Sequence, residues 1–403
     1  MKYIVILGDG MADYRQPFLN NKTPLELAVK PTIDGLAMHG EVGLAKTVPD
    51  GMKPGSDVAN LSVLGYNPKD CYTGRSPLEA GSIGINLKGT DVTARANLVT
   101  LTDEEVFENK TMVDYSAGEI SSAEAKELID ALAKELNNDE YKLYSGISYR
   151  HCLVIDNGSI AGDLTPPHDI TGKPIKNHLP TSERGLKYLD LMKKSVEILK
   201  DHPVNIKRIK GGKRPANSLW FWGEGTKPAL QDFTEKFGIK GGIISAVDLL
   251  KGIAKLSNMT VLEVENATGN YDTNFIGKAK ACVDGLTGGL DFVYVHMEAP
   301  DECGHHGDSE HKIWSIGQIS EVVVKYIKEE LDKLGEDYKI LVCPDHPTPL
   351  NIMTHVSDPV PYILFDSRKD LSNGANAYTE DQAKSTGKFV DNGFDLMQKL
   401  LKD

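Results

Sequence analysis

The sequence is short of the features that mark secreted and nucleic-acid-binding proteins. Only five of its 403 residues are cysteines, at positions 71, 152, 282, 303 and 343, and no two form a CxxC pair. An odd, scattered set argues against a disulfide framework and favours a reducing cytoplasm. Basic residues number 45 against 58 acidic ones, a formal net charge of −13. That charge disfavours nucleic-acid and anionic-membrane partners, but it is compatible with a locally basic pocket for an anionic substrate.

Long apolar runs and nucleotide-binding loops are also missing. The first apolar run, residues 3–7, is too short for a signal peptide or a bilayer span, and the rest of the chain has no long apolar stretch. We therefore expect a soluble, cytoplasmic protein. The chain has no GxxxxGK[ST] loop and no GxGxxG turn after its first apolar run. This absence counts against a nucleotide site of either common kind.

The chain does contain a series of short apolar runs bounded by Gly, Pro and Asp. They occupy residues 3–7, 260–264, 292–297, 339–343 and 362–366. Such runs are typical of buried strands in a parallel sheet. Amphipathic helices are predicted over residues 121–136, 182–199 and 313–334. Alternation of strands and helices indicates an α/β fold with a mostly parallel sheet flanked by helices.

The middle of the chain has a different character. Residues 90–214 combine mixed strand patterns with a Pro/Gly-rich passage, GDLTPPHDITGKPIKNHLP. We interpret this region as an inserted, smaller α+β domain. Residues 1–89 and 215–403 would then form one discontinuous core domain.

Aspartates and histidines gather where three predicted strands end. They are Asp9 after the first strand, Asp301 with His305 and His306 after the strand at 292–297, and Asp345 with His346 and His355 after the strand at 339–343. Ligands of open α/β sheets bind at the carboxyl ends of the strands, so one edge would collect all three groups. Mixed Asp and His ligands suit Zn²⁺, Mn²⁺ or Co²⁺, with Mg²⁺ at a carboxylate-rich position. So many ligands favour two divalent ions that clamp both sides of a phosphoryl displacement.

Ser56 is the candidate nucleophile for such a site. It follows a tight Pro-Gly turn and precedes a predicted short helix in the segment PGSDVANLSVLGY. Two roles stay open from these residues alone. The hydroxyl could cap the helix, or it could attack a substrate with its alkoxide stabilised by a metal ion and by helix N–H groups.

Several motifs occur in order along nearly the whole chain. They are GDGMAD, KTPLELAVKPTIDGLAMHGEVGL, PGSDVANLSVLGYNPKDCYTGRSPLEA, GISYRH, KRPANSLWFWGEG, EAPDECGHHGD and CPDHPTP. Together they resemble the archaeal-type cofactor-independent phosphoglycerate mutases, which belong to the alkaline phosphatase superfamily. The resemblance implies an alkaline-phosphatase-like core that carries an inserted substrate-binding cap. It also implies a glycolytic isomerase.

The resemblance assigns roles to individual core residues. Ser56 would accept the phosphate. The implied metal ligands are Asp9, Asp345 and His346 together with Ser56 for one ion, and Asp301, His305 and His355 for the other. His305 is preferred to His306 because the family separates this aspartate and histidine by four positions.

The resemblance also implies residues that handle the substrate. Arg150 and Arg214 match cap arginines that hold the phosphate and carboxylate, which suits the planar two-donor fork of arginine. Asp169 resembles a position that handles the substrate hydroxyls. Lys251 resembles a core-domain lysine near the phosphate.

The implied reaction is phosphotransfer through a phosphoserine that interconverts 3-phosphoglycerate and 2-phosphoglycerate. Chains of this branch have also been proposed to act as homoserine kinases that use ATP, and a plain phosphomonoesterase is a third candidate. A metal-binding scaffold with a degenerate site is disfavoured because the serine, the ligands and the arginines are all present. The expected partner is a small phosphorylated anion, with no nucleic acid or membrane, and a monomer and a homo-oligomer both stay open.

Overall fold

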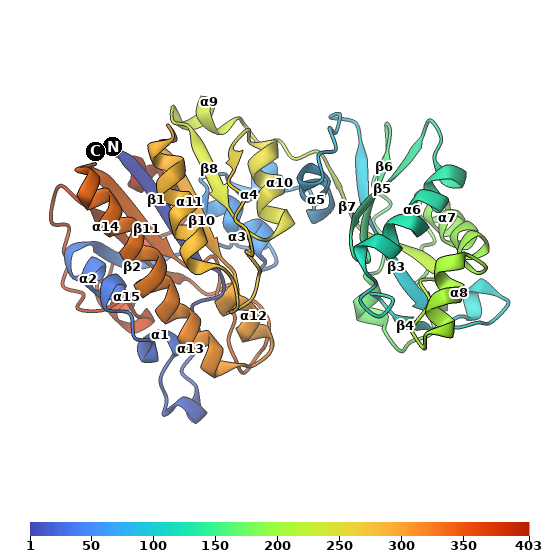
Figure 1. The fold of residues 1–403 in the computed structure, drawn as a ribbon, viewed down its shortest axis with the longest axis horizontal. Coiled ribbons are helices and arrows are strands. Elements are labelled where there is room, and N and C mark those ends of the chain that lie inside the picture. The colour runs from blue at the N-terminus through green and yellow to red at the C-terminus, as the bar shows by residue number, and fades with distance from the viewer. Residues whose placement is uncertain (403) are drawn as a thin grey trace. The chain divides into compact units, whose positions relative to one another are not determined.

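A computed structural model of the chain describes residues 1–402, which form two compact units (Figure 1). The first unit comprises Met1–Tyr72 and the chain from Ala229 onward, and the second comprises Thr73–Pro228. Within residues 1–402, every helix is too short or too polar to cross a membrane.

The first unit is built on an eight-stranded sheet of order β13-β2-β12-β11-β1-β10-β8-β9. The strands are β1 (Lys2–Gly8), β2 (Glu41–Ala45), β8 (Gly241–Ile244), β9 (Thr260–Val261), β10 (Phe292–Met297), β11 (Tyr338–Cys343), β12 (Val360–Asp366) and β13 (Phe389–Val390). β1 lies between β11 and β10 and runs parallel to both. These central strands are covered on both faces, which explains their nearly continuous apolar sequences. The predicted α/β fold with a mostly parallel sheet is confirmed.

Two predicted strands differ from the structure. The run at 362–366 was expected to be parallel, but β12 pairs antiparallel with both β11 and β2. The chain returns from β11 to its neighbour without a crossover helix, and a strand joined in that way runs antiparallel. The run at 260–264 is a strand only at Thr260–Val261, because it pairs with two residues of the short strand β8.

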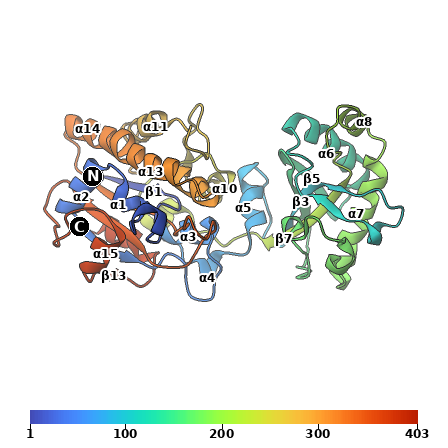
Figure 2. The ribbon, with the colours of Figure 1, turned by 90° about the horizontal axis from the view of Figure 1, so that it is seen from below.

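Helices cover both faces of this sheet (Figure 2). They are α1 (Pro24–Leu27), α2 (Pro31–His39), α3 (Ser56–Val63), α4 (Pro68–Cys71), α9 (Phe233–Phe237), α10 (Asp248–Leu256), α11 (Phe275–Thr287), α12 (Ala299–His305), α13 (Ser309–Gln318), α14 (Lys325–Leu334), α15 (Glu380–Ser385) and α16 (Asp395–Leu401). Residues of α2, α11, α13 and α14 share one apolar core with the sheet. The helix predicted at 313–334 is composite, because a π-helical segment (Ile319–Val324) joins α13 to α14. It ends at Gly335 in the left-handed conformation (φ 66°), as its glycine predicted.

The second unit has a five-stranded sheet whose pairings are all antiparallel. Its strands are β3 (Val92–Leu101), β4 (Met112–Asp114), β5 (Tyr141–Ile147), β6 (Arg150–Ile155) and β7 (Ser218–Thr226). Its helices are α5 (Arg75–Ser82), α6 (Ser122–Leu136), α7 (Glu183–Leu199) and α8 (Pro203–Lys210). Ser121 and Ser182 cap α6 and α7, so both helices begin where their sequences predicted.

The second unit is larger than the sequence suggested. The expected boundaries at 89/90 and 214/215 fall inside it, because α5 packs against β3 and β7, and β7 pairs with β3. Thr73, where the chain enters this unit, donates a hydrogen bond to the carbonyl of Thr226, where the chain leaves its last strand. The entering and leaving segments therefore lie side by side.

Candidate metal centre

The candidate ligands follow three neighbouring parallel strands, so they lie at the carboxyl end of the first sheet. Asp9 directly follows β1, and Asp345 comes two residues after β11 ends. β10 leads through one residue into α12, whose first turn contains Asp301. Because β11, β1 and β10 are adjacent and parallel, their carboxyl ends meet, as the sequence predicted.

The first ligand group consists of Asp9, Asp345 and His346. Their candidate ligand atoms all lie within 4.8 Å of one another, and all three residues are buried. Nε2 of His346 lies 3.3 Å from Oδ2 of Asp345 and 3.7 Å from Oδ1 of Asp9. Burial lowers the pKa of His346, which favours the neutral imidazole that a metal ion requires.

Asp9 shows that this group fits a cation. Its Oδ1 atom is buried and has no hydrogen-bond partner within residues 1–402. Burial, reinforced by the negative charges of Asp345 and Asp301, raises the pKa of Asp9 well above its ordinary value. A buried carboxylate oxygen without a partner is costly. A divalent cation held by this oxygen, Asp345 and His346 would remove that cost.

The second ligand group lies beside the first and shares a histidine with it. It consists of Asp301, His346 and His355, whose ligand atoms also lie within 4.8 Å of one another. Nε2 of His305 lies 3.2 Å from Asp301 Oδ2 and 2.9 Å from His355 Nε2. Burial acts to raise the pKa of Asp301, but hydrogen bonds from His305 and His355 lower it well below its usual range. The sequence did not predict that His346 would belong to both groups.

The two adjacent histidines of α12 lie in different surroundings. His305 stands one turn after Asp301, and the hydrogen bond between them is the main reason that its pKa is raised to about 9. His306 contacts the carbonyl of Glu302 through Nδ1, at 2.8 Å, and is exposed. The geometry therefore brings His305, and not His306, to the ligand group.

Ser56 is the first residue of α3 rather than its cap. The capping position belongs to Gly55, and no side chain within residues 1–402 makes a capping hydrogen bond to this helix. Oγ of Ser56 lies 3.1 Å from Nε2 of His346. Asn60, one turn further along α3, donates to the Ser56 carbonyl at 2.8 Å and to Asp345 Oδ2 at 2.9 Å. The capping role is therefore wrong, and the hydroxyl faces the first ligand group.

The contacts of Lys251 within residues 1–402 do not include any candidate metal ligand or Ser56. Its ammonium group pairs with Glu263 at 2.7 Å. The helix that carries it, α10, packs against α3, so the lysine and Ser56 stand on neighbouring helices.

Two of the three candidates in the second unit contact one cluster of aromatic and polar side chains, and the third pairs with a sequence neighbour of that cluster. The cluster consists of Arg95, Asn97, Tyr115, Tyr149, His168 and Trp222, linked by ring contacts and by hydrogen bonds. Arg150 lies over Tyr149, and Asp169 lies 3.6 Å from His168. Arg214 pairs with Asp114 at 2.5 Å, next to Tyr115. Sequence reasoning missed Arg95 and Asn97, which stand two positions apart on one face of β3.

Comparison with known proteins identifies the family. A family model described as 2,3-bisphosphoglycerate-independent phosphoglycerate mutase matches residues 37–205. The Methanosarcina barkeri protein of that name is 48% identical over 403 residues, covering 100% of both chains. A Geobacter sulfurreducens protein named as a probable member is 48% identical over 401 residues, again covering 100% of both. The chain belongs to the 2,3-bisphosphoglycerate-independent phosphoglycerate mutase family.

Solved structures agree with this placement among the mutases. The cofactor-independent phosphoglycerate mutase from Thermoplasma acidophilum is 29% identical, with a TM-score of 0.65, over 100% of this chain and 99% of that one. A Pyrococcus horikoshii protein is 30% identical, with a TM-score of 0.83, over 99% of this chain and 96% of that one. The fold of both units therefore recurs in related proteins.

Sequence reasoning missed a buried polar network beneath Asp9. His296 of β10 contacts Asp9 Oδ2 through Nε2 at 3.0 Å, and Glu298 lies on its other side. Burial opposes a charge on His296, but the carboxylates of Glu298 and Asp9 raise its pKa to about 10. The available signal was a histidine inside the apolar run FVYVHM, followed two residues later by glutamate.

A second missed network holds the loop between β11 and β12. Lys312 of α13 is fully buried and donates to Asp13 Oδ2 and to the carbonyl of Thr348, both at 2.7 Å. The hydroxyl of Thr348 in turn bonds a carboxylate oxygen of Asp301. Asp13 also accepts the backbone N–H of Leu350. These contacts fix the segment that carries His346 and His355.

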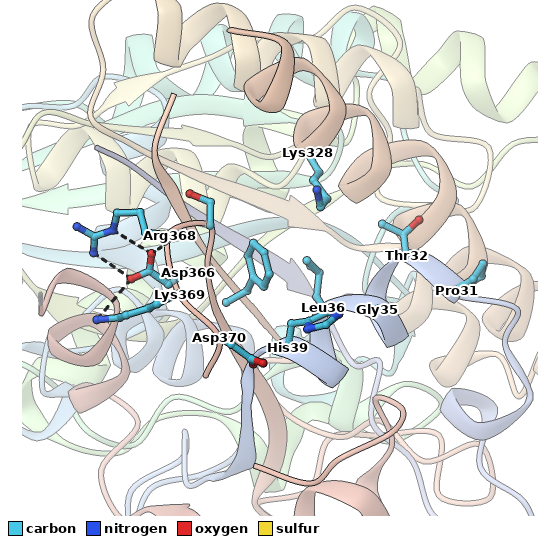
Figure 3. Close-up of a pocket in the computed structure, with 12 residues that line it drawn as sticks. Pro31, Thr32, Gly35, Leu36, His39, Lys328, Asp366, Arg368, Lys369 and Asp370 are labelled. Atoms are coloured by element: carbon cyan, nitrogen blue, oxygen red, sulfur yellow. Dashed lines mark hydrogen bonds and ion pairs between the residues drawn. The ribbon is translucent and has the colours of Figure 1, made fainter. Parts of the chain in front are cut away.

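A separate cavity of about 570 Å³ (Figure 3) lies away from the candidate metal ligands. Its lining includes Leu36 and His39 of α2, Lys328 of α14 and Asp366 at the end of β12. Asp366 pairs in register with Lys339, near the start of β11, so the cavity belongs to the opposite edge of the sheet. It is not part of the candidate metal centre of the mutase fold.

Proposed function

We propose that this protein interconverts 3-phosphoglycerate and 2-phosphoglycerate by phosphoryl transfer through Ser56, without 2,3-bisphosphoglycerate. Relatives that match the chain over its full length carry the name of this activity. The observation that carries the proposal is the Ser56 hydroxyl, 3.1 Å from His346 Nε2 and beside the buried carboxylates of Asp9 and Asp345.

We further propose that two divalent cations, drawn from Mn²⁺, Zn²⁺, Co²⁺ and Mg²⁺, serve this reaction. Asp9, Asp345 and His346 would hold one together with Ser56, and Asp301, His305 and His355 would hold the other. His346 is assigned to the first ion because its Nε2 faces both Asp345 and Ser56. Bound ions of this kind offset negative charge on the serine alkoxide and on the transferring phosphoryl group.

The transfer proceeds in two matched steps on this chain. Ser56 Oγ loses its proton and forms a bond to phosphorus as the bond between phosphorus and the C3 oxygen of the substrate breaks, and the C3 oxygen takes up a proton. In the second step the C2 oxygen of glycerate loses its proton and bonds to phosphorus as the bond from phosphorus to Ser56 Oγ breaks, and Ser56 regains a proton. The backbone N–H groups at the start of α3 add positive potential at the serine in both steps.

Residues outside the ligand groups would hold and orient the substrate. Arg150 and Arg214 would bind its carboxylate and phosphate. Lys251 would offset charge on the phosphoryl oxygens, and Asp169 would accept the proton of the 2-hydroxyl. Lys251 pairs with Glu263, and Asp169 lies beside His168. In both proposed roles, the side chain would leave this partner and contact the substrate instead. The second unit would act as a cap that excludes water from the phosphoserine.

Replacement of Ser56 by alanine tests the reaction path. Ser56→Ala should abolish mutase turnover while unfolding temperature and metal content stay near those of the wild type, because the phosphate acceptor is removed but Asp9, Asp345 and His346 remain to hold the ion. The matched control is Ser62→Ala on the same helix, whose buried hydroxyl has no hydrogen-bond partner within residues 1–402. Normal turnover by the Ser56 variant would refute the phosphoserine path.

A substrate screen separates the proposed activity from its relatives. With Mn²⁺ present, 3-phosphoglycerate alone should be converted to 2-phosphoglycerate. Homoserine with ATP, and phosphothreonine, should give no phosphohomoserine and no sustained phosphate release. Phosphorylation of homoserine, with 3-phosphoglycerate left unchanged, would assign a kinase instead. The five cysteines are free and buried, which fits our proposal of a cytoplasmic location.

A further inference from the structure

Asp9 is attached to a chain of buried polar groups at the end of the sheet. His296 is the register neighbour of Leu7 in the adjacent strand, so its imidazole reaches the carboxylate two residues further along the chain. Its Nε2 lies 3.0 Å from Asp9 Oδ2. Its Nδ1 lies 3.1 Å from both Ser245 Oγ and Glu298 Oε1. Both ring nitrogens therefore have polar partners, and the ring orientation is set from two sides.

Glu298 is held as firmly as the histidine it contacts. Its Oε1 accepts the backbone N–H of Ala246 at 2.8 Å and the hydroxyl of Ser245 at 3.0 Å. Its Oε2 pairs with the ammonium group of Lys278, which also donates to the carbonyl of His296 at 2.9 Å. Lys278 and His296 are 0% exposed and Glu298 is 3% exposed. A buried network in which every member is satisfied is rigid, so it can fix a neighbouring group.

The two oxygens of Asp9 have different surroundings. Oδ2 is occupied by His296, whereas Oδ1 has no hydrogen-bond partner within residues 1–402. Oδ1 is also the oxygen that faces His346, at 3.7 Å. Asp345 is held by other means, since backbone N–H groups of Gly10 and His346 and the side chain of Asn60 donate to it. A change at His296 should therefore act on the metal centre through Asp9.

We propose that His296 is a positioning residue that binds Oδ2 of Asp9 and leaves Oδ1 as the oxygen that ligates the divalent ion. Glu298, anchored by Lys278 and Ser245, fixes the imidazole in the orientation this task needs. Without His296 the Asp9 carboxylate can rotate about its terminal bond, and its ligating oxygen is no longer pre-set. Partners that orient metal ligands in this way are worth about 10- to 100-fold in metal affinity. The inference rests on the proposed metal centre.

Binding of Mn²⁺ to metal-free protein tests the inference without any activity assay. His296→Leu removes both ring contacts at similar volume, and its Mn²⁺ affinity by calorimetry should fall about 10- to 100-fold. His296→Gln keeps an N–H donor that can reach Asp9, so it should recover most of that loss. The paramagnetic resonance spectrum of bound Mn²⁺ should broaden in the leucine variant and return toward the wild type in the glutamine variant.

Control variants distinguish the positioning role of His296 from the proposed metal centre itself. His151→Leu removes another buried histidine, one in the second unit, and should leave Mn²⁺ affinity unchanged. Asp9→Asn should lose Mn²⁺ at the first ligand group, and unchanged binding there would overturn the metal centre itself. If Asp9→Asn loses the ion while His296→Leu binds it as the wild type does, only the positioning role is overturned.

Misfolding of the histidine variants is checked in the same samples. Thermal unfolding of the metal-free proteins should show cooperative transitions for His296→Leu and His296→Gln. If the leucine variant does not fold, the Gln variant and the double variant Lys278→Met/Glu298→Gln carry the test. The double variant removes the anchor without leaving a lone buried charge, and its Mn²⁺ affinity should also fall. Wild-type affinity in that folded double variant would overturn the role of Glu298 and Lys278.

Discussion

His346 contributes one imidazole to two neighbouring groups of ligands. Its Nε2 faces Ser56 and Asp345, and its ring stacks on that of His355 with centroids 3.9 Å apart. Because His346 belongs to both ligand groups, we expect its replacement to disturb both. At the residue scale the centre is therefore one connected structure rather than two independent sites.

The adjacent pair His305 and His306 gives a matched test of ligand assignment. His305→Ala should lower Mn²⁺ affinity at least about 10-fold, because it removes a nitrogen beside Asp301 and His355. His306→Ala should leave affinity within about twofold, since within residues 1–402 its ring has one polar contact, the carbonyl of Glu302. Calorimetric titration of metal-free protein measures both. A larger loss in the His306 variant would reverse the assignment.

The aspartates of the centre could be predicted from sequence because each follows its own strand. Asp9, Asp301 and Asp345 were found because short apolar runs end just before them. His296 was missed because it lies inside such a run, where a side chain is expected to be core. The sharing of His346 could not be foreseen, because it depends on the path of the loop to His355.

At the scale of elements, α13 holds the loop that carries His346 and His355. Lys312 links Asp13, just after β1, to the carbonyl of Thr348 in the β11–β12 loop. The pair is completely buried, with both side chains 0% exposed. One charged residue of a helix thus joins two loops that border the centre.

Loss of this pair should destabilise the fold strongly. Lys312→Met leaves the Asp13 carboxylate buried without its cation, which should lower the free energy of unfolding by about 3–5 kcal/mol. The control is Lys328→Met on α14, whose exposed pair with Asp332 should contribute less than about 1 kcal/mol. Urea unfolding of both variants measures the difference. Equal stabilities of the two variants would contradict the role of the buried pair.

The central strands β1, β10 and β11 and the helices α6 and α7 were predictable because their patterns are local. The direction of β12 was not, because an apolar run has no direction and its pairing depends on the connection that precedes it. The domain boundaries were shifted for a similar reason. α5 and β7 join the second unit through contacts with β3, which is distant from β7 in the sequence.

At the scale of the whole molecule, the half-buried carboxyl group of Glu380 makes stability depend on pH. Glu380 accepts hydrogen bonds from the backbone N–H of Asp13 and the hydroxyl of Thr23. Burial, reinforced by the charge of Asp13, raises the pKa of Glu380 from 4.5 to about 7. Between these values the native protein holds a proton that the unfolded chain has lost. The contribution of Glu380 to stability therefore declines as the pH rises through about 7.

Glu380→Gln should remove this decline. A shift of this size corresponds to a loss on the order of 3 kcal/mol by pH 8 in the wild type, which the neutral amide does not suffer. The variant should therefore gain stability relative to the wild type as the pH rises from 5 to 8. Urea unfolding with a chelator present, at pH 5, 6.5 and 8, measures the trend. Parallel pH profiles for the two proteins would rule out a contribution from Glu380.

The chain enters and leaves the second unit at neighbouring points, where the hydroxyl of Thr73 donates a hydrogen bond to the carbonyl of Thr226. An insertion whose ends meet can be exchanged without altering the register of the sheet that receives it. Ser56 and the candidate metal ligands thus lie in one module of the chain, and the two arginines proposed to bind the substrate lie in the other. Relatives can diverge in the module that follows residue 72 while they retain the aspartates and histidines of the other. Under the proposed function, we expect a change of substrate to call for changes in the inserted unit rather than redesign of the centre.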